Sequence, residues 1–96
     1  PDDAAALHNY GLTLLAESAA AKAIPVLRDA IHRDAANADA QNALAVALIH
    51  TKDYTGAWKA LAGAAAIAPA NTDILVNQIL LQACLKDISD KKGKKK

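Results

Sequence analysis

An internal repeat of 34 residues constrains this chain more than any other feature of its sequence. When residues 4–37 are aligned with residues 38–71, eight positions are identical, and five of these are Ala pairs. Because 25 of the 96 residues are Ala, identity alone decides little. The spacing is more informative, since small and apolar residues recur on both sides of a break at 51–53 and the stretch closes with Pro69. Such a unit is typical of two helices that are joined by a turn and stacked on the next pair.

The composition favours helices and excludes several other classes of protein. Ala loses no side-chain entropy in a helix, whereas Val and the aromatic residues, which favour strands, are scarce, with three Val, two Tyr, one Trp and no Phe. Charges or amides interrupt every apolar window of about 18–20 residues, which argues against a transmembrane span. We therefore predict an all-α fold with five helices, at about 4–17, 20–34, 38–51, 54–67 and 72–88.

Acidic and amide residues stand where these helices begin. A side-chain oxygen at the N-cap accepts a hydrogen bond from a backbone N–H that has no partner within the helix. The candidates are Asp2 or Asp3 for the first helix, Asn37 or Asp39 for the third, Asp53 for the fourth, and Thr72 or Asp73 for the fifth.

The order of small, apolar and turn residues resembles the tetratricopeptide repeat, a helix–turn–helix unit of 34 residues with the pattern W-x2-L-G-x2-Y…A-x3-F…P. The second unit matches this pattern with Leu44, Ala45, Leu48, Ala57, Leu61 and Pro69, and the first unit with Tyr10, Gly11, Leu14, Ala23 and Leu27. The first unit departs from the pattern where Leu7 replaces Trp and Ala35 replaces Pro. The resemblance implies a right-handed stack of helical hairpins, with two units (4–37 and 38–71) and a C-terminal helix. We expect this domain to span residues 1–90.

The resemblance also implies a function, because tetratricopeptide repeats serve as scaffolds and adaptors in protein–protein interaction and are not enzymes. The first helix of each unit lines a concave groove in this family. The predicted groove residues here are His8, Leu12, Leu15, Asn42, Val46, Ile49, His50, Val76, Leu80 and Cys84. Asp39 and Asp73 also stand at groove positions, with Ala5, Ala16 and Ala83. Some relatives hold a peptide carboxylate with Lys and Arg, but no Lys or Arg stands at those positions here. We therefore expect a helical or apolar segment of a partner to bind.

No arrangement of residues in the sequence indicates catalysis or a cofactor. His8 and His50 belong to equivalent helices but stand eight repeat positions apart, about 12 Å along the helix axis, which is too far to share a metal ion. His32 belongs to the other class of helix. Cys84 has no evident base beside it, so a groove-lining thiol is the simpler interpretation.

Two alternatives to groove binding remain open. The groove side chains can pack on one another, or the protein can be a structural module whose C-terminal helix associates with a second copy. The second idea rests on helix 72–88, whose only polar stripe is the narrow one formed by Gln78, Gln82 and Lys86. We expect this helix to pack on the second unit through Ile74, Leu81 and Leu85, which leaves Val76, Leu80 and Cys84 to the groove or a partner. The reverse packing exposes Leu81, Leu85 and Ile88.

Charge is unevenly distributed along the chain. Residues 91–96 carry five Lys, whereas residues 1–90 carry six basic and ten acidic residues. We expect 91–96 to be a disordered basic tail with at most weak attraction to anionic membranes. We do not expect nucleic acid as a partner, because residues for base stacking are scarce and the rest of the chain is acidic. A single Cys and the lack of a signal-like segment lead us to expect a cytoplasmic fragment or processed product.

Overall fold

The computed structural model describes residues 3–93, which contain five helices and no strand. The helices are α1 (Ala4–Ala16), α2 (Ala20–Arg33), α3 (Ala38–His50), α4 (Tyr54–Ile67) and α5 (Thr72–Gly93). The all-α prediction is confirmed, and the first four helices begin at the predicted residues and end within one residue of the predicted positions. The fifth helix extends five residues beyond its predicted end at residue 88.

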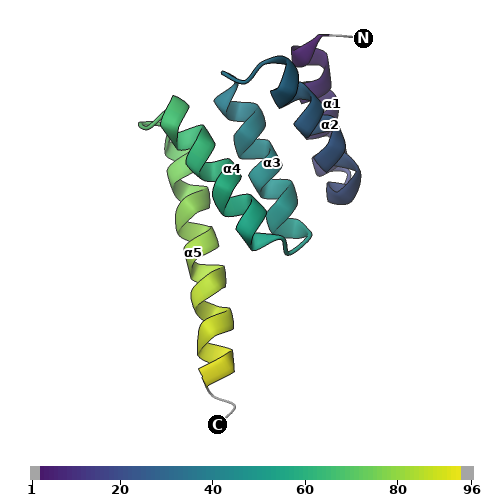
Figure 1. Ribbon diagram of the computed structural model, residues 1–96. Coiled ribbons are helices and arrows are strands. Elements are labelled where there is room, and N and C mark those ends of the chain that lie inside the picture. The colour runs from purple at the N-terminus through teal and green to yellow at the C-terminus, as the bar shows by residue number, and fades with distance from the viewer. Residues whose placement is uncertain (1–2, 94–96) are drawn as a thin grey trace.

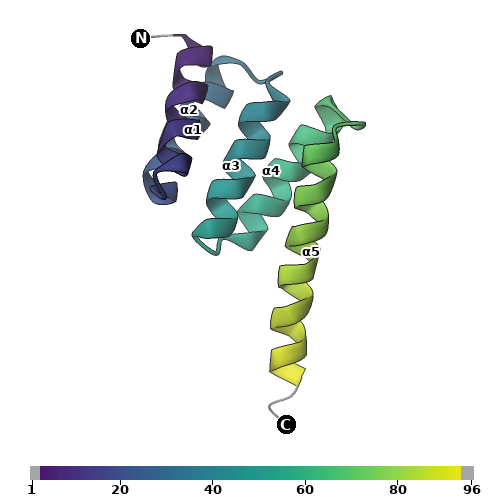
Figure 2. The same ribbon diagram turned by 180° about the vertical axis from the view of Figure 1, so that it is seen from behind.

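The helices form two layers (Figures 1 and 2). The first helices of the units lie in one layer, where α3 contacts both α1 and α5, and α2 and α4 form the other layer. Each hairpin is closed by extensive contact between its own two helices, α1 with α2 and α3 with α4. The hairpins then stack through α2 on α3, and α5 packs against α4 and α3. This is the arrangement of a helical repeat in which each unit contacts only its neighbours.

Side-chain caps fix the N-termini of four helices. Backbone N–H groups donate to Asp3 at α1 (2.9 Å), to Asn37 at α3 (3.0 Å) and to Asp53 at α4 (3.0 Å). For α5 the prediction of Thr72 or Asp73 is wrong, because the N–H of Ile74 donates to Asn71 Oδ1 at 3.2 Å. The helix begins one residue earlier than a Thr72 cap requires, and Asn71 occupies the same repeat position as Asn37.

The turns that close the two hairpins are equivalent. Ser18 and Lys52, which are 34 residues apart, both adopt the left-handed conformation, with φ of 63° and 67°. In each turn the following residue donates to a carbonyl five residues back, from Ala19 N to Leu14 O and from Asp53 N to Leu48 O, both at 2.8 Å. This pattern is the Schellman motif, which satisfies the last carbonyl groups of a helix. Both hairpins therefore reverse direction by the same backbone geometry although the turn sequences differ.

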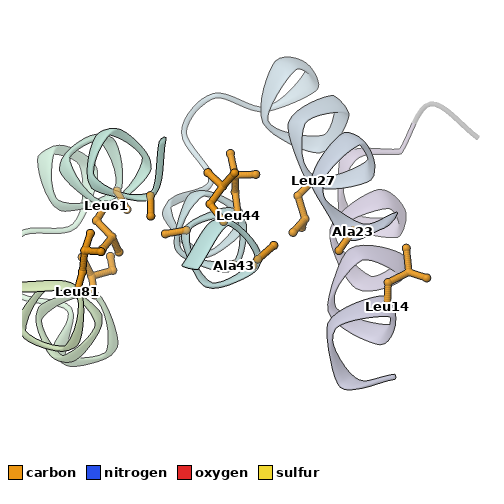
Figure 3. Packing of buried hydrophobic residues seen from close by; sticks show 13 residues of the cluster. Leu14, Ala23, Leu27, Ala43, Leu44, Leu61 and Leu81 are labelled. Atoms are coloured by element: carbon orange, nitrogen blue, oxygen red, sulfur yellow. The ribbon is translucent and has the colours of Figure 1, made fainter. Parts of the chain in front are cut away.

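The core repeats with the same period. Ala23, Leu27 and Ala30 of α2 and their equivalents Ala57, Leu61 and Ala64 of α4 are all fully or almost fully buried. Leu27 points from α2 toward α3, and Leu61 and Leu81 lie against each other between α4 and α5 (Figure 3). Gly11 shows why the crossing positions are small, because a β-carbon there would overlap the side chain of Leu27. Close helix crossings of this kind require residues of low volume.

The orientation of α5 is mostly as predicted. Ile74 and Leu81 are buried against the second unit, as expected. Leu85 is instead 40% exposed, because α5 projects beyond the other helices at its C-terminal end (Figure 1). The helix continues to Gly93, so residues 91–93 of the expected tail are helical, whereas residues 94–96 lie outside the described residues. Lys is a good helix former and is favoured near a helix C-terminus, which accounts for the longer helix.

Candidate partner-binding groove

Two adjacent hollows mark the surface formed by α1, α3 and α5, the layer nearest the viewer in Figure 2. The first hollow has a volume of about 440 Å³ and lies where α3 and α5 begin. Its walls come from all three helices and comprise His8, Leu12, Leu15, Asp39, Asn42, Ala43, Val46 and Asp73. A lining that combines apolar side chains with a few polar ones is typical of a surface that receives a side chain or a short segment of another molecule.

The second hollow lies between the later turns of α3 and α5 and measures about 500 Å³. Its lining is more apolar and comprises Val46, Ile49, His50, Asn77, Leu80, Ala83, Cys84 and Asp87. Val46 belongs to both hollows, so the two are continuous along α3. We call the combined surface the groove.

A hydrogen bond between two amides crosses the groove at the boundary between the hollows. Asn77 Nδ2 of α5 donates to Asn42 Oδ1 of α3 at 2.8 Å, and both residues are partly buried. This contact fixes the position of α5 relative to α3 on the groove side. At the far edge of the first hollow, Asn37 Nδ2 lies 3.4 Å from His8 Nδ1, which holds the imidazole against the start of α3.

Nine of the ten predicted groove residues line the hollows. His8, Leu12, Leu15 and Asn42 line the first hollow, Val46 lines both, and Ile49, His50, Leu80 and Cys84 line the second. Val76 lines neither and is 46% exposed one turn before Leu80. The sequence prediction placed Asp39 and Asp73 at groove positions, but it did not include Asp87, which reaches the groove because α5 continues past the end of α3.

Two further apolar surfaces lie outside the groove. Leu75, Val76 and Ile79 lie on the side of α5 opposite the buried Ile74 and Leu81, and Ile79 is 65% exposed. We call these three residues the outer face of α5. A separate hollow between α4 and α5 is lined by Tyr54, Thr55, Trp58, Gln82 and Leu85. This hollow was not predicted from the sequence, although the bulky Trp58 stands at the repeat position of Ile24.

The described residues contain no cluster of three or more His, Cys, Asp or Glu able to hold a metal ion. Cys84 is partly buried in the second hollow and forms no disulfide. None of the helices within residues 3–93 combines the length and the hydropathy needed to span a bilayer.

Comparison with known proteins identifies the family. The family model of the tetratricopeptide repeat matches residues 14–79, which cover more than half of the chain. The chain therefore belongs to the tetratricopeptide repeat family, as the spacing of its small and apolar residues predicts. This family is a non-catalytic module of protein–protein interaction. Among curated proteins, no relative matches the chain.

Proposed function

We propose that this chain is a scaffold or adaptor that holds an amphipathic helix or an apolar peptide segment of another protein in the groove. The observation that supports this most directly is the pair of continuous hollows on α1, α3 and α5, which are lined by apolar side chains together with a few polar ones. An amphipathic helix binds such a surface by burying apolar residues at i, i+3, i+4 and i+7 spacing. The module has no catalytic role in this proposal and acts in the cytoplasm.

The exposure of large apolar side chains in the groove supports the binding of a partner there. Leu12 is 43% exposed and Leu80 is 55% exposed, although both are large aliphatic side chains. Their packing within the chain is therefore incomplete. Burying such a side chain fully is worth about 1.5–3 kcal/mol, so a partner that covers both gains affinity from each.

Two adjacent residues of α5 provide a matched test. Leu80 lines the groove, whereas Ile79 lies on the outer face and is exposed to a similar extent. Peptides of about 14 residues, or four helical turns, would be selected from a random library for binding to the full chain. We expect Leu80→Ser to weaken their binding at least about tenfold, because a buried apolar contact is lost. Ile79→Ser should leave it unchanged. Equal effects of the two substitutions, or an effect of Ile79→Ser alone, would contradict binding in the groove.

A second candidate function is self-association through α5, and the outer face of this helix favours it. Leu75, Val76 and Ile79 are all about half exposed or more and form one continuous apolar strip. Surfaces of this kind are commonly interaction sites. Sedimentation velocity of the full chain over a range of concentrations tests this candidate. A dimer that dissociates on Leu75→Ser and Ile79→Ser together supports it, and a monomer at all concentrations excludes it.

A further inference from the structure

The charged residues that line the surface hollows differ in sign between the two faces of this molecule. Among the residues whose side chains the structure describes, the charged ones that line the groove are Asp39, Asp73 and Asp87, all acidic. Across the molecule, a hollow between α2 and α4 is lined by Arg28 and Lys59 and by no acidic residue. Residues 3–89, whose side chains the structure describes, include six cationic residues, and none of them lines the groove: Lys22, Arg28, Arg33, Lys52, Lys59 and Lys86.

Helix stabilisation alone does not account for the acidic residues. Asp39 and Asp73 lie in the first turns of α3 and α5, where a negative charge interacts favourably with the helix dipole. However, α1, α2 and α4 form without any acidic residue in their first turns. The first-turn acids thus occur only on two helices that line the groove, and both face the same hollow.

The two carboxylates are also unneutralised within the described part of the chain. Neither Asp39 nor Asp73 forms an ion pair or side-chain hydrogen bond there, and both residues are exposed. Asp87 does interact within the chain, so the inference rests on the other two. Two exposed like charges beside the apolar side chains of the groove attract a ligand of opposite charge and disfavour an acidic one.

We infer that the partner segment is a basic amphipathic helix of another protein. Its apolar side covers Leu12, Val46 and Leu80, and its Lys or Arg residues lie beside Asp39 and Asp73 at the end of the groove where α3 and α5 begin. This inference rests on the proposed groove function and specifies the chemistry of the partner. The charge of the groove is thus opposite to that of the relatives that hold a peptide carboxylate with Lys and Arg.

Two synthetic peptides test this inference on the full chain. Both are about 14 residues long with Leu at i, i+3, i+4 and i+7 spacing, and the remaining positions are Lys in one and Glu in the other. Fluorescence anisotropy of labelled peptide gives the affinity at low and high salt. We expect the Lys peptide to bind more tightly and to lose affinity with salt, because exposed charges are screened. The variant Asp39→Asn with Asp73→Asn should weaken its binding roughly 2- to 30-fold.

The matched control removes two acidic residues that do not line the groove, Glu17→Gln with Asp34→Asn, and should change the affinity less than the groove variant does. Circular dichroism confirms that each variant is folded at the assay temperature. An equal loss in the control would overturn the inference, because the general field of the protein would then be responsible.

The remaining outcomes separate the inference from the proposed function. If both peptides bind alike and Leu80→Ser weakens both, the basic partner is wrong and the groove function stands. If neither peptide binds, or if binding survives Leu80→Ser, both are wrong. If sedimentation without peptide shows a dimer that the Asp39→Asn, Asp73→Asn variant dissociates, the occupant is a second copy of this basic-tailed chain, which overturns a foreign partner.

Discussion

The second hairpin and α5 begin with corresponding residues of the repeat but differ in how they continue. In the hairpin, Ala45 and Leu48 of α3 are buried under α4, and Lys52 adopts the left-handed turn that reverses the chain. At the same repeat positions, α5 has the exposed Ile79 and Gln82, and the helix continues through Lys86.

The difference shows what closing a hairpin requires. The residues that follow α3 include Ala57 and Leu61, which are buried, whereas Lys91 and Lys95 stand at the corresponding repeat positions in the C-terminal segment. Lysines at these two positions cannot make the buried apolar contacts that Ala57 and Leu61 make in the second hairpin. The same dipeptide, Lys-Asp, therefore lies in a turn at 52–53 and within a helix at 86–87. Packing of the following helix, and not the local sequence, decides between the two.

The largest expected effect lies at the centre of the closed hairpin. Leu61 of α4 is fully buried in the core shared with α3 and α5. The substitution Leu61→Ala therefore leaves a cavity and should lower the free energy of unfolding by about 2–5 kcal/mol. Urea denaturation followed by circular dichroism measures the change. As a control, Ile79→Ala on α5 should cost less than about 0.5 kcal/mol. Similar losses of stability for both variants would mean that Ile79 is not exposed as described.

A smaller effect is expected where the hairpin helices cross. Ala57 is fully buried at the position equivalent to Ala23, and Ala57→Leu should destabilise the protein by about 1–3 kcal/mol through overpacking. The melting temperature records the loss. The exposed Ala62 of the same helix is the control, since Ala62→Leu adds the same volume without a neighbour to displace. If both variants melt like the wild type, the close crossing of α3 and α4 is wrong.

Substitution by Gly should have opposite effects on stability at Lys52, which lies in a turn, and at its repeat equivalent Lys86, which lies within α5. Lys52→Gly removes the steric cost of the left-handed conformation (φ 67°) and should stabilise the fold by about 0.5–1 kcal/mol. Lys86→Gly places Gly within a helix and should disfavour that part of α5 by about 0.8–1 kcal/mol, which circular dichroism detects as lost helicity. Stabilisation by Gly at both positions would indicate that α5 turns at Lys86 as α3 turns at Lys52.

The smallest effect on stability is expected on the outer face of α5. Leu75→Ser with Ile79→Ser should change the free energy of unfolding of the monomer by less than about 0.5 kcal/mol per residue, because both side chains are largely exposed. Thermal melts at low protein concentration measure this. A large loss at low concentration would mean that these residues belong to the core. A loss that appears only at high concentration would instead support self-association.

Much of the groove was predictable because it follows from the repeat. Once the 34-residue phase is recognised, the first helix of each unit defines one layer, and His8, Asn42 and Leu80 fall on the same side of it. The hollow beside Trp58 was not predictable in the same way, since it depends on how far α5 and α4 diverge beyond Leu81. Asp87 stands at the repeat position of Asp53, which lies in a turn, so its place in the groove depends on α5 continuing as a helix where α3 ends.

The sequence by itself determined where the helices begin, which small residues stand at their crossings, and which residues share a face, because capping, helix propensity and the period of 3.6 residues are local properties. Only the tertiary structure decided which apolar side of α5 is buried. Ile74 and Leu81 lie on one side and Val76, Ile79 and Leu80 on the other, and either set is apolar enough to form a core. Leu61 and the small residues of α4 offer a complementary surface to Ile74 and Leu81 alone, so the second set remains exposed beside the groove.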